Sequence, residues 1–133
     1  MPNPPNENKA AGIVYEVEFQ LECLKRGYVV SVPVGDNAGY DFVVDGDDGL
    51  KRIQVRGTTL FQNYRYQVGT GTGANKTVRR DAYDFLVVRI PNHDAWYVVP
   101  RKVLGNIKAV HFFPQNPASK GKYEPYRDAF GLL

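Results

Sequence analysis

The chain has 133 residues, a formal net charge of +3 and 43% hydrophobic residues. That length suits one domain, and the hydrophobic content supports a folded core, which excludes wholesale disorder. No apolar run approaches the roughly 20 residues that cross a bilayer, and the Pro-rich first residues lack the apolar stretch of a signal peptide. Because the single cysteine, Cys23, excludes a disulfide scaffold and a multi-cysteine zinc site, we expect one cytoplasmic globular domain.

Charge is distributed unevenly along the chain. Residues 36–48 carry five aspartates and no Lys or Arg, whereas residues 50–80 carry seven basic residues and no acid. The net charge of the whole chain is too small to indicate a polyanion as partner, but the basic stretch is a local field that attracts phosphate groups. Its basic residues are Lys51, Arg52, Arg56, Arg65, Lys76, Arg79 and Arg80.

The first predicted element is a helix over residues 8–26, preceded by a mobile tail at residues 1–8 and ended by Gly27. Its apolar residues repeat at helical spacing, so we expect this stripe to face a sheet. On the shoulder of the stripe lies Glu16, which predicts a partly buried carboxylate where helix and sheet meet. The stripe consists of Ile13, Val17, Leu21 and Leu24.

β-branched and alternating segments predict strands at residues 28–33, 40–45, 50–57, 84–90 and 95–99. The turn D-G-D-D-G joins the second and third strands, and P-N-H-D joins the last two. We expect a loop over residues 58–80, with an irregular strand inside it as an open alternative. We also expect a helical turn at 100–104 and an extended tail from residue 114. This order predicts an α+β or mixed α/β fold, with a four- or five-stranded sheet covered by the first helix.

Four polar residues stand where apolar ones would be expected: Glu16, Asp41, Gln54 and Arg56. Gln54 and Arg56 share one face of their strand, and a hairpin would bring Asp41 beside them. Two carboxylates and an amide oxygen are hard ligands that suit Mg²⁺, and a cation beside them suits a phosphodiester transition state. Structural alternatives remain open: Asp41 as a turn cap, Glu16 as a helix-surface charge, and Gln54 and Arg56 as a solvated strand face.

The segments G-I-V-Y-E, P-V-G-D-N-A-G-Y-D-F-V-V-D and R-I-Q-V-R-G-T, within residues 9–59, resemble the PD-(D/E)xK nuclease superfamily. The pattern is most similar to the small branch that includes group I intron homing endonucleases and archaeal Holliday-junction resolvases. The resemblance implies a restriction-endonuclease-like core over residues 9–113, between a flexible tail (1–8) and an extended tail (114–133). It also implies DNA as substrate and Mg²⁺ or Mn²⁺ as cofactor.

The resemblance also assigns roles residue by residue. Asp41 matches the metal-binding aspartate of the family, and Glu16 matches the first-helix glutamate that completes the metal site. Gln54 stands where most members have Glu, although the intron-endonuclease branch uses Gln. Arg56 replaces the catalytic Lys, and because Arg stays protonated, its role as a general base is in doubt.

The leading hypothesis is therefore a metal-dependent DNA endonuclease that acts as a homodimer, since cutting two strands requires two sites. DNA would be held by Lys51, Arg52, Arg65, Lys76, Arg79 and Arg80. One alternative is a catalytically weakened or inactive DNA-binding or assembly protein on the same fold. Another is a β-rich interaction domain with no role in nucleic-acid binding, for which salt-dependent DNA binding would be absent.

Overall fold

A computed structural model describes residues 7–35, 38–71, 82–116, 118 and 121–133. Each of the five expected strands is present, with ends within two residues of the expected ones. The helices are α1 (Glu7–Lys25) and α2 (Arg101–Leu104), with 3₁₀ helices at Pro91–His93, Glu124–Tyr126 and Phe130–Leu132. The strands are β1 (Val29–Ser31), β2 (Phe42–Gly46), β3 (Gly49–Gly57), β4 (Phe61–Gln62), β5 (Arg65–Gly69), β6 (Phe85–Ile90), β7 (Ala95–Pro100) and β8 (Ala109–Phe112).

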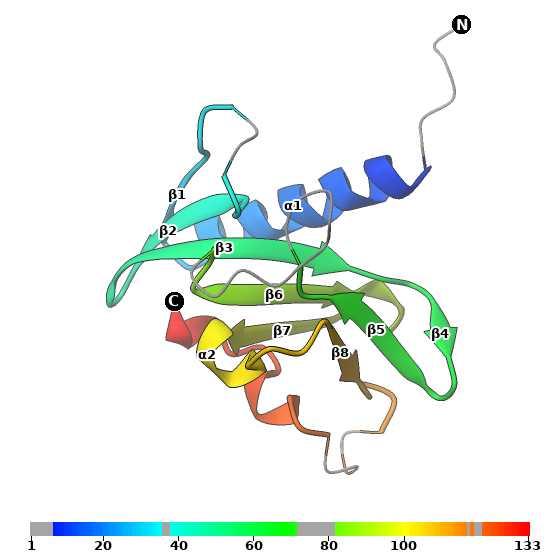
Figure 1. Ribbon diagram of the computed structural model, residues 1–133. Helices are drawn as coiled ribbons and strands as arrows, with labels where there is room; N and C mark the ends of the chain where they lie inside the picture. Colours follow the sequence, from blue (N-terminus) through cyan, green and yellow to red (C-terminus); the bar gives the residue numbers. More distant parts are fainter. Residues whose placement is uncertain (1–6, 36–37, 72–81, 117, 119–120) are drawn as a thin grey trace, which may run out of the picture.

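The fold is mixed α+β, with α1 lying along one face of a five-stranded sheet of order β1-β2-β3-β6-β7 (Figure 1). All neighbours in this sheet are antiparallel except β3 and β6, which run parallel. The predicted fold class, a mixed sheet with an N-terminal helix packed on it, is confirmed. Across the part of the chain that the structure describes, no helix is both long and apolar enough to span a membrane.

The central strand β3 separates two layers of side chains. Ile53 and Val55 join the core under α1, whereas Gln54 lies on the other face, opposite Leu86 of β6. Because successive residues of a strand point to opposite faces, Arg56 shares the face of Gln54. The alternation expected for this strand is therefore present.

The apolar stripe of α1 does not face the sheet, so that prediction is wrong. The helix instead buries its opposite side, through Tyr15, Phe19 and Cys23. Phe19 packs against the rings of Phe42 and Trp96, and aromatic side chains bury more apolar area than aliphatic ones. The stripe residues are exposed: Ile13 by 53%, Val17 by 56%, Leu21 by 51% and Leu24 by 65%.

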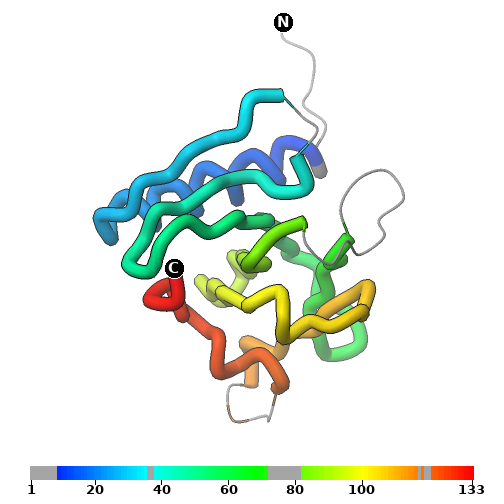
Figure 2. Tube along the Cα trace, turned by 60° about the vertical axis from the view of Figure 1, so that its left-hand side comes forward, coloured from blue at the N-terminus to red at the C-terminus, as the bar shows by residue number. Residues whose placement is uncertain are grey.

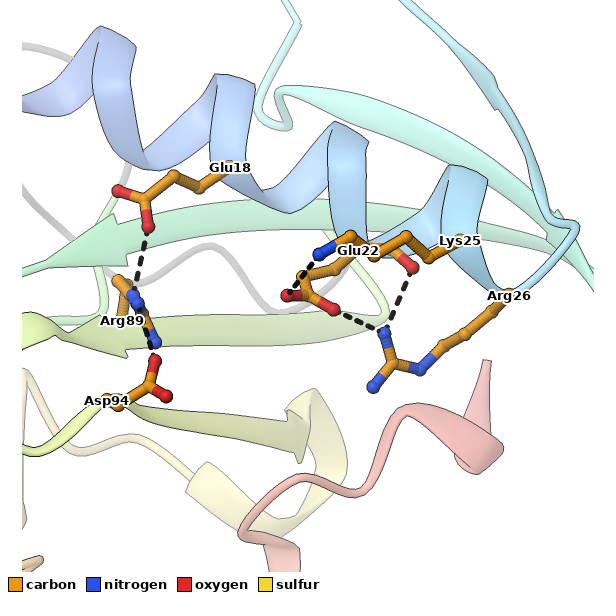
Figure 3. A network of polar contacts seen from close by, with 6 residues as sticks. All are labelled: Glu18, Glu22, Lys25, Arg26, Arg89 and Asp94. Atoms are coloured by element: carbon orange, nitrogen blue, oxygen red, sulfur yellow. Dashed lines mark hydrogen bonds and ion pairs between the residues drawn. The ribbon is translucent and has the colours of Figure 1, made fainter.

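An ion pair on one flank ties α1 to the sheet (Figure 3). Glu18 accepts a hydrogen bond from Arg89 of β6 at 3.2 Å, and Arg89 also pairs with Asp94 at 2.9 Å. Near the end of the helix Arg26 pairs with Glu22 at 2.6 Å, an i, i+4 contact within the same segment. The contact between Glu18 and Arg89 is the one of these pairs that connects the charged flank of α1 with β6.

Residues 58–80 were expected to form a loop, with an irregular strand as the alternative, and the described part contains two short strands, β4 and β5. They join β8 in a second, three-stranded sheet. The turn between β4 and β5 has two residues of positive φ, Asn63 at 53° and Tyr64 at 62°, which matches a tight hairpin turn. Strand β8 was not predicted from the sequence.

The C-terminal segment differs from the extended tail that was expected. It forms two 3₁₀ helices, and Phe130 and Leu133 are buried in the core under α1. The Tyr28 hydroxyl donates to the carbonyl of Phe130 at 3.2 Å. Figure 2 shows this segment returning toward the β2–β3 hairpin.

Candidate active site

Asp41 precedes β2 and extends its pairing with β3. Its backbone N–H donates to the Ile53 carbonyl at 2.8 Å, so Asp41 lies opposite Gln54. Its Oδ2 accepts from the Val55 N–H at 2.8 Å and from Gln54 Nε2 at 3.0 Å. Because the Val55 N–H points along the sheet, the Asp41 carboxylate lies at the level of the sheet, where β2 has not yet begun.

Glu16 reaches the same place from α1. Tyr15 lies over Gly57 at the end of β3, so closely that a Cβ on Gly57 would overlap its ring. This contact places the next residue, Glu16, above the end of β3 and beside Asp41. Burial raises the pKa of Glu16 to about 7, helped by the Asp41 charge and a hydrogen bond with Asp41, while Arg56 opposes the shift.

Asp41 responds differently to the same neighbours. Burial raises its pKa, and the Val55 N–H, the Arg56 charge and the hydrogen bond from Glu16 all act to lower it. The two carboxyl groups therefore share a proton more readily than isolated carboxyl groups would. Burial is the main cause and the neighbouring carboxylate is the second, so a bound cation would favour the ionised pair.

The donor set fits a divalent metal ion of the hard class. Glu16 and Asp41 offer carboxylate oxygens, and Gln54, only 5% exposed, offers an amide oxygen. In the segments that the structure describes, no group of three or more His, Cys, Asp or Glu residues is arranged to hold a metal. A set of two carboxylates suits Mg²⁺, which usually takes one or two and keeps several waters.

Arg56 is anchored on backbone carbonyls rather than on the carboxylates. Its Nη2 donates to the Gly71 carbonyl at 2.7 Å, and its Nη1 donates to the Val55 carbonyl at 3.4 Å. Its charge acts to lower the pKa of both Glu16 and Asp41. The structure thus brings the four predicted residues together at one end of β3. The role of Gly71 went unnoticed because a backbone carbonyl leaves no signal in the sequence.

The basic residues expected to hold DNA do not form one patch in the described chain. Arg52 pairs with Asp84 at 3.1 Å, and Lys51 donates to the Asp48 carbonyl at 3.0 Å, both at the start of β3 and away from Gln54. Arg65 lies on β5. The remaining three predicted residues, Lys76, Arg79 and Arg80, lie outside the described residues.

The outer face of the second sheet carries polar side chains near Arg65. Gln62 lies opposite Arg65, and Gln67 lies opposite His111, with Gln67 Oε1 and His111 Nε2 3.0 Å apart. The other face of this sheet is apolar and packs on the core. Gln67 and His111 could not be recognised from the sequence as neighbours on this face, because their proximity depends on β8.

A cavity of about 880 Å³ lies at the other end of β3, beside α2. Its lining includes Leu50, Arg52, Asp84 and Arg101, and none of the four candidate residues. The candidate residues therefore lie apart from this cavity, toward the other end of β3.

A family model described as PD-(D/E)XK endonuclease matches residues 6–132. Among solved structures, a bacterial homing endonuclease, I-Ssp6803I, is similar with a TM-score of 0.74 and 22% identity, covering 93% of this chain and 90% of that chain. Hjc, a Holliday junction resolvase from Archaeoglobus fulgidus, is similar with a TM-score of 0.51 and 15% identity, covering 79% of this chain and 88% of that chain. No curated protein sequence matches significantly. The predicted restriction-endonuclease-like core is confirmed.

Proposed function

Because the chain belongs to the PD-(D/E)XK endonuclease family, we propose that it is a metal-dependent endonuclease that hydrolyses phosphodiester bonds in DNA. The observation that carries the proposal is the convergence of Glu16 and Asp41 beside Gln54 and Arg56, with Gln54 Nε2 donating to Asp41 at 3.0 Å. Nucleases of this family generally use divalent metal ions. DNA as substrate also agrees with the two similar structures, which are a homing endonuclease and a Holliday junction resolvase.

Glu16, Asp41 and Gln54 would hold Mg²⁺ or Mn²⁺. When bound, the ion supplies Lewis-acid stabilisation of the charge that develops on the phosphate. The Val55 N–H fixes the Asp41 carboxylate, so its orientation is set before any ligand arrives. Ionisation of Glu16 makes the second carboxylate available, and its pKa of about 7 places that step near neutral pH.

Arg56 supplies positive charge beside the carboxylates. Its guanidinium has five N–H donors, and the described residues use two of them. The others suit the non-bridging oxygens of a phosphate, whose charge grows in the transition state. Arg56 does not act as a base, because its guanidinium stays protonated.

DNA would lie along the outer face of the second sheet. Arg65 and Gln67 project from β5, and the chain after β5 leads to Gly71, which holds Arg56. The hydrogen bond between Arg56 and the Gly71 carbonyl therefore connects this part of the chain with the candidate site. Arg and Gln side chains are also those that recognise guanine and adenine edges in the major groove. Lys51, Arg52, Lys76, Arg79 and Arg80 would add contacts to phosphates.

A single site cuts one strand, so we expect two copies of the chain to act together on duplex DNA. We also place the protein in the cytoplasm, where a lone buried thiol such as Cys23 stays reduced.

The deciding experiment is a nuclease assay on plasmid, nicked and branched DNA with Mg²⁺ or Mn²⁺. We expect metal-dependent cleavage that Asp41→Asn lowers by about 100-fold or more, since one fixed electrostatic contact is worth that much. Asp45→Asn is the matched control. Because Asp45 is exposed on β2, we expect this variant to cleave DNA like the wild type. Cleavage that persists in chelator, or that survives Asp41→Asn, would contradict the proposed site.

The second candidate is a DNA-binding or assembly protein that does not cut. Arg56 favours it, because it replaces the family's lysine and donates to the Gly71 carbonyl. This candidate would bind DNA with strong salt dependence and show no cleavage with either metal.

A further inference from the structure

The outward side of α1 is an aliphatic strip with nothing packed on it in the described chain. Besides the predicted stripe it includes Val14, 52% exposed. Four of its residues, together with Ala10 one turn before them, follow one another in alternating steps of four and three residues. This is the heptad spacing of a helix that packs against another helix. We call these five the α1 seam: Ala10, Val14, Val17, Leu21 and Leu24.

The α1 seam is a second apolar face on a helix that has already buried one. Tyr15, Phe19 and Cys23 point into the core from the opposite side. A surface helix normally has one apolar face and a polar face toward water. Contiguous exposed aliphatic surface of this kind marks an interaction site.

We propose that the α1 seam packs against the α1 seam of a second copy of this chain. Heptad seams are self-complementary, because the knobs of one helix fit the holes of an identical one. A membrane surface fits poorly, since helices that lie on membranes carry Lys and Arg on the polar side and often Trp or Phe on the apolar side. The seam has no aromatic residue, and its flanks are mostly acidic or neutral, with Glu18 and Gln20 on opposite sides.

The arrangement of the surface agrees with this occupant. Stable interfaces have an apolar centre with a polar rim. The seam and the adjoining Ile13 provide the aliphatic centre, and Glu18, Gln20 and Lys25 provide the rim. This inference concerns the second copy that the proposed function requires. Its test measures the mass of the protein in solution and not cleavage, so failure of this inference can be distinguished from failure of the proposed function.

The test is sedimentation equilibrium of the full chain without DNA or metal, from micromolar to submillimolar concentration. We expect the wild type to dimerise and the double variant Val17→Glu/Leu21→Glu to have a dimer dissociation constant at least about 100-fold higher, from the loss of apolar burial. Both side chains are more than half exposed, so the variant should keep the far-UV spectrum of the wild type. Leu50→Glu is the control, because Leu50 is 70% exposed on β3 and lies outside the seam.

A second measurement locates the interface directly. Cys23 is fully buried and burial raises its pKa to about 12, so a cysteine introduced in the seam is the reactive thiol. If the two helices run parallel, oxidised Leu21→Cys should give a covalent dimer. If they run antiparallel, an oxidised mixture of Val17→Cys and Leu21→Cys should give one. A monomeric wild type, or a dimer that neither cross-links nor responds to the double variant, would overturn the proposal. So would binding of a monomer to vesicles of anionic lipid.

Discussion

The ring of Tyr15 on α1 rests directly on the backbone of Gly57 at the end of β3, with no room for a methyl group between them. This contact sets the height of the helix above the strand that carries Gln54 and Arg56. It therefore also sets the reach of Glu16 toward Asp41.

Gly57→Ala should displace Tyr15 and loosen the site. We expect the free energy of unfolding to fall by about 1–3 kcal/mol, the usual cost of overpacking. Urea unfolding measures this, and the nuclease assay should show a parallel loss. The control is Gly12→Ala in α1, where a Cβ meets nothing and helix propensity should add up to about 1 kcal/mol. Equal stability of Gly57→Ala and the wild type would show that the contact does not position the helix.

The shared proton predicts a pH dependence of stability. The pKa of Glu16 is about 7 in the folded chain against an ordinary 4.5, so the folded state binds this proton more tightly than the unfolded state. Its contribution to stability is complete below the ordinary pKa and is lost as pH rises through about 7. Glu16→Gln removes this dependence. In chelator, the stability of the wild type should fall relative to this variant across that interval, as thermal unfolding measures. Parallel curves would contradict the shared proton.

Metal binding should reverse that loss. We expect Mg²⁺ or Mn²⁺ to raise the melting temperature of the wild type above neutral pH, because a ligand that binds only the folded state stabilises it. The rise should shrink at acidic pH, where Glu16 is protonated, and vanish in Asp41→Asn. Asp45→Asn should respond like the wild type. An equal rise in Asp41→Asn would place the metal elsewhere.

Variants of Arg56 test whether the site needs only the positive charge of this side chain or also the shape of its guanidinium. If it only supplies charge, Arg56→Lys should keep or raise cleavage, whereas Arg56→Ala should lower it by about 100- to 1,000-fold. A strong loss in Arg56→Lys would mean that the forked guanidinium, held by Gly71, is required. If the protein binds DNA without cutting, neither variant will cleave and Arg56→Ala will only weaken binding slightly. Cleavage rates and DNA affinity should be measured on the same preparations.

DNA affinity should fall steeply with salt. If about four to six of the seven basic residues of positions 50–80 touch phosphates, log K should fall with a slope of roughly −4 to −5 against log salt. Arg65→Ala should reduce that slope by about 1, and neutralising Arg79 and Arg80 together should flatten it further. Lys25→Ala on α1 is the control, with its side chain 61% exposed. An unchanged slope in Arg65→Ala would show that the DNA does not bind along the second sheet.

Local patterns in the sequence were enough to predict the five strands of the main sheet and the proximity of the four candidate residues. The D-G-D-D-G turn fixes the β2–β3 register, and that register puts Asp41 opposite Gln54. The orientation of α1 could not be found in this way, because the helix has apolar residues on two opposite faces. Periodicity shows that Val17 and Phe19 lie on different faces, but not which face meets the sheet.

The second sheet was missed for a related reason. β4 has two residues and β8 has four, so neither carries enough alternation to stand out. Their pairing joins residues far apart in the chain, such as Gln67 and His111. Contacts of that range, like the one between Arg56 and the Gly71 carbonyl, follow from the tertiary fold and not from local spacing.

The parallel pairing of β3 with β6 has a consequence for folding. The β2–β3 hairpin forms from neighbouring residues, but β3 gains its second neighbour, β6, only after the chain has passed through β4 and β5. Closing so long a loop is slow, so we expect the edge of the strand bearing Gln54 and Arg56 to stay unpaired until late in refolding. Trp96, the single tryptophan, is buried on β7 in the late half. Stopped-flow fluorescence should therefore report this closure directly, as a phase slower than the gain of helical signal from α1.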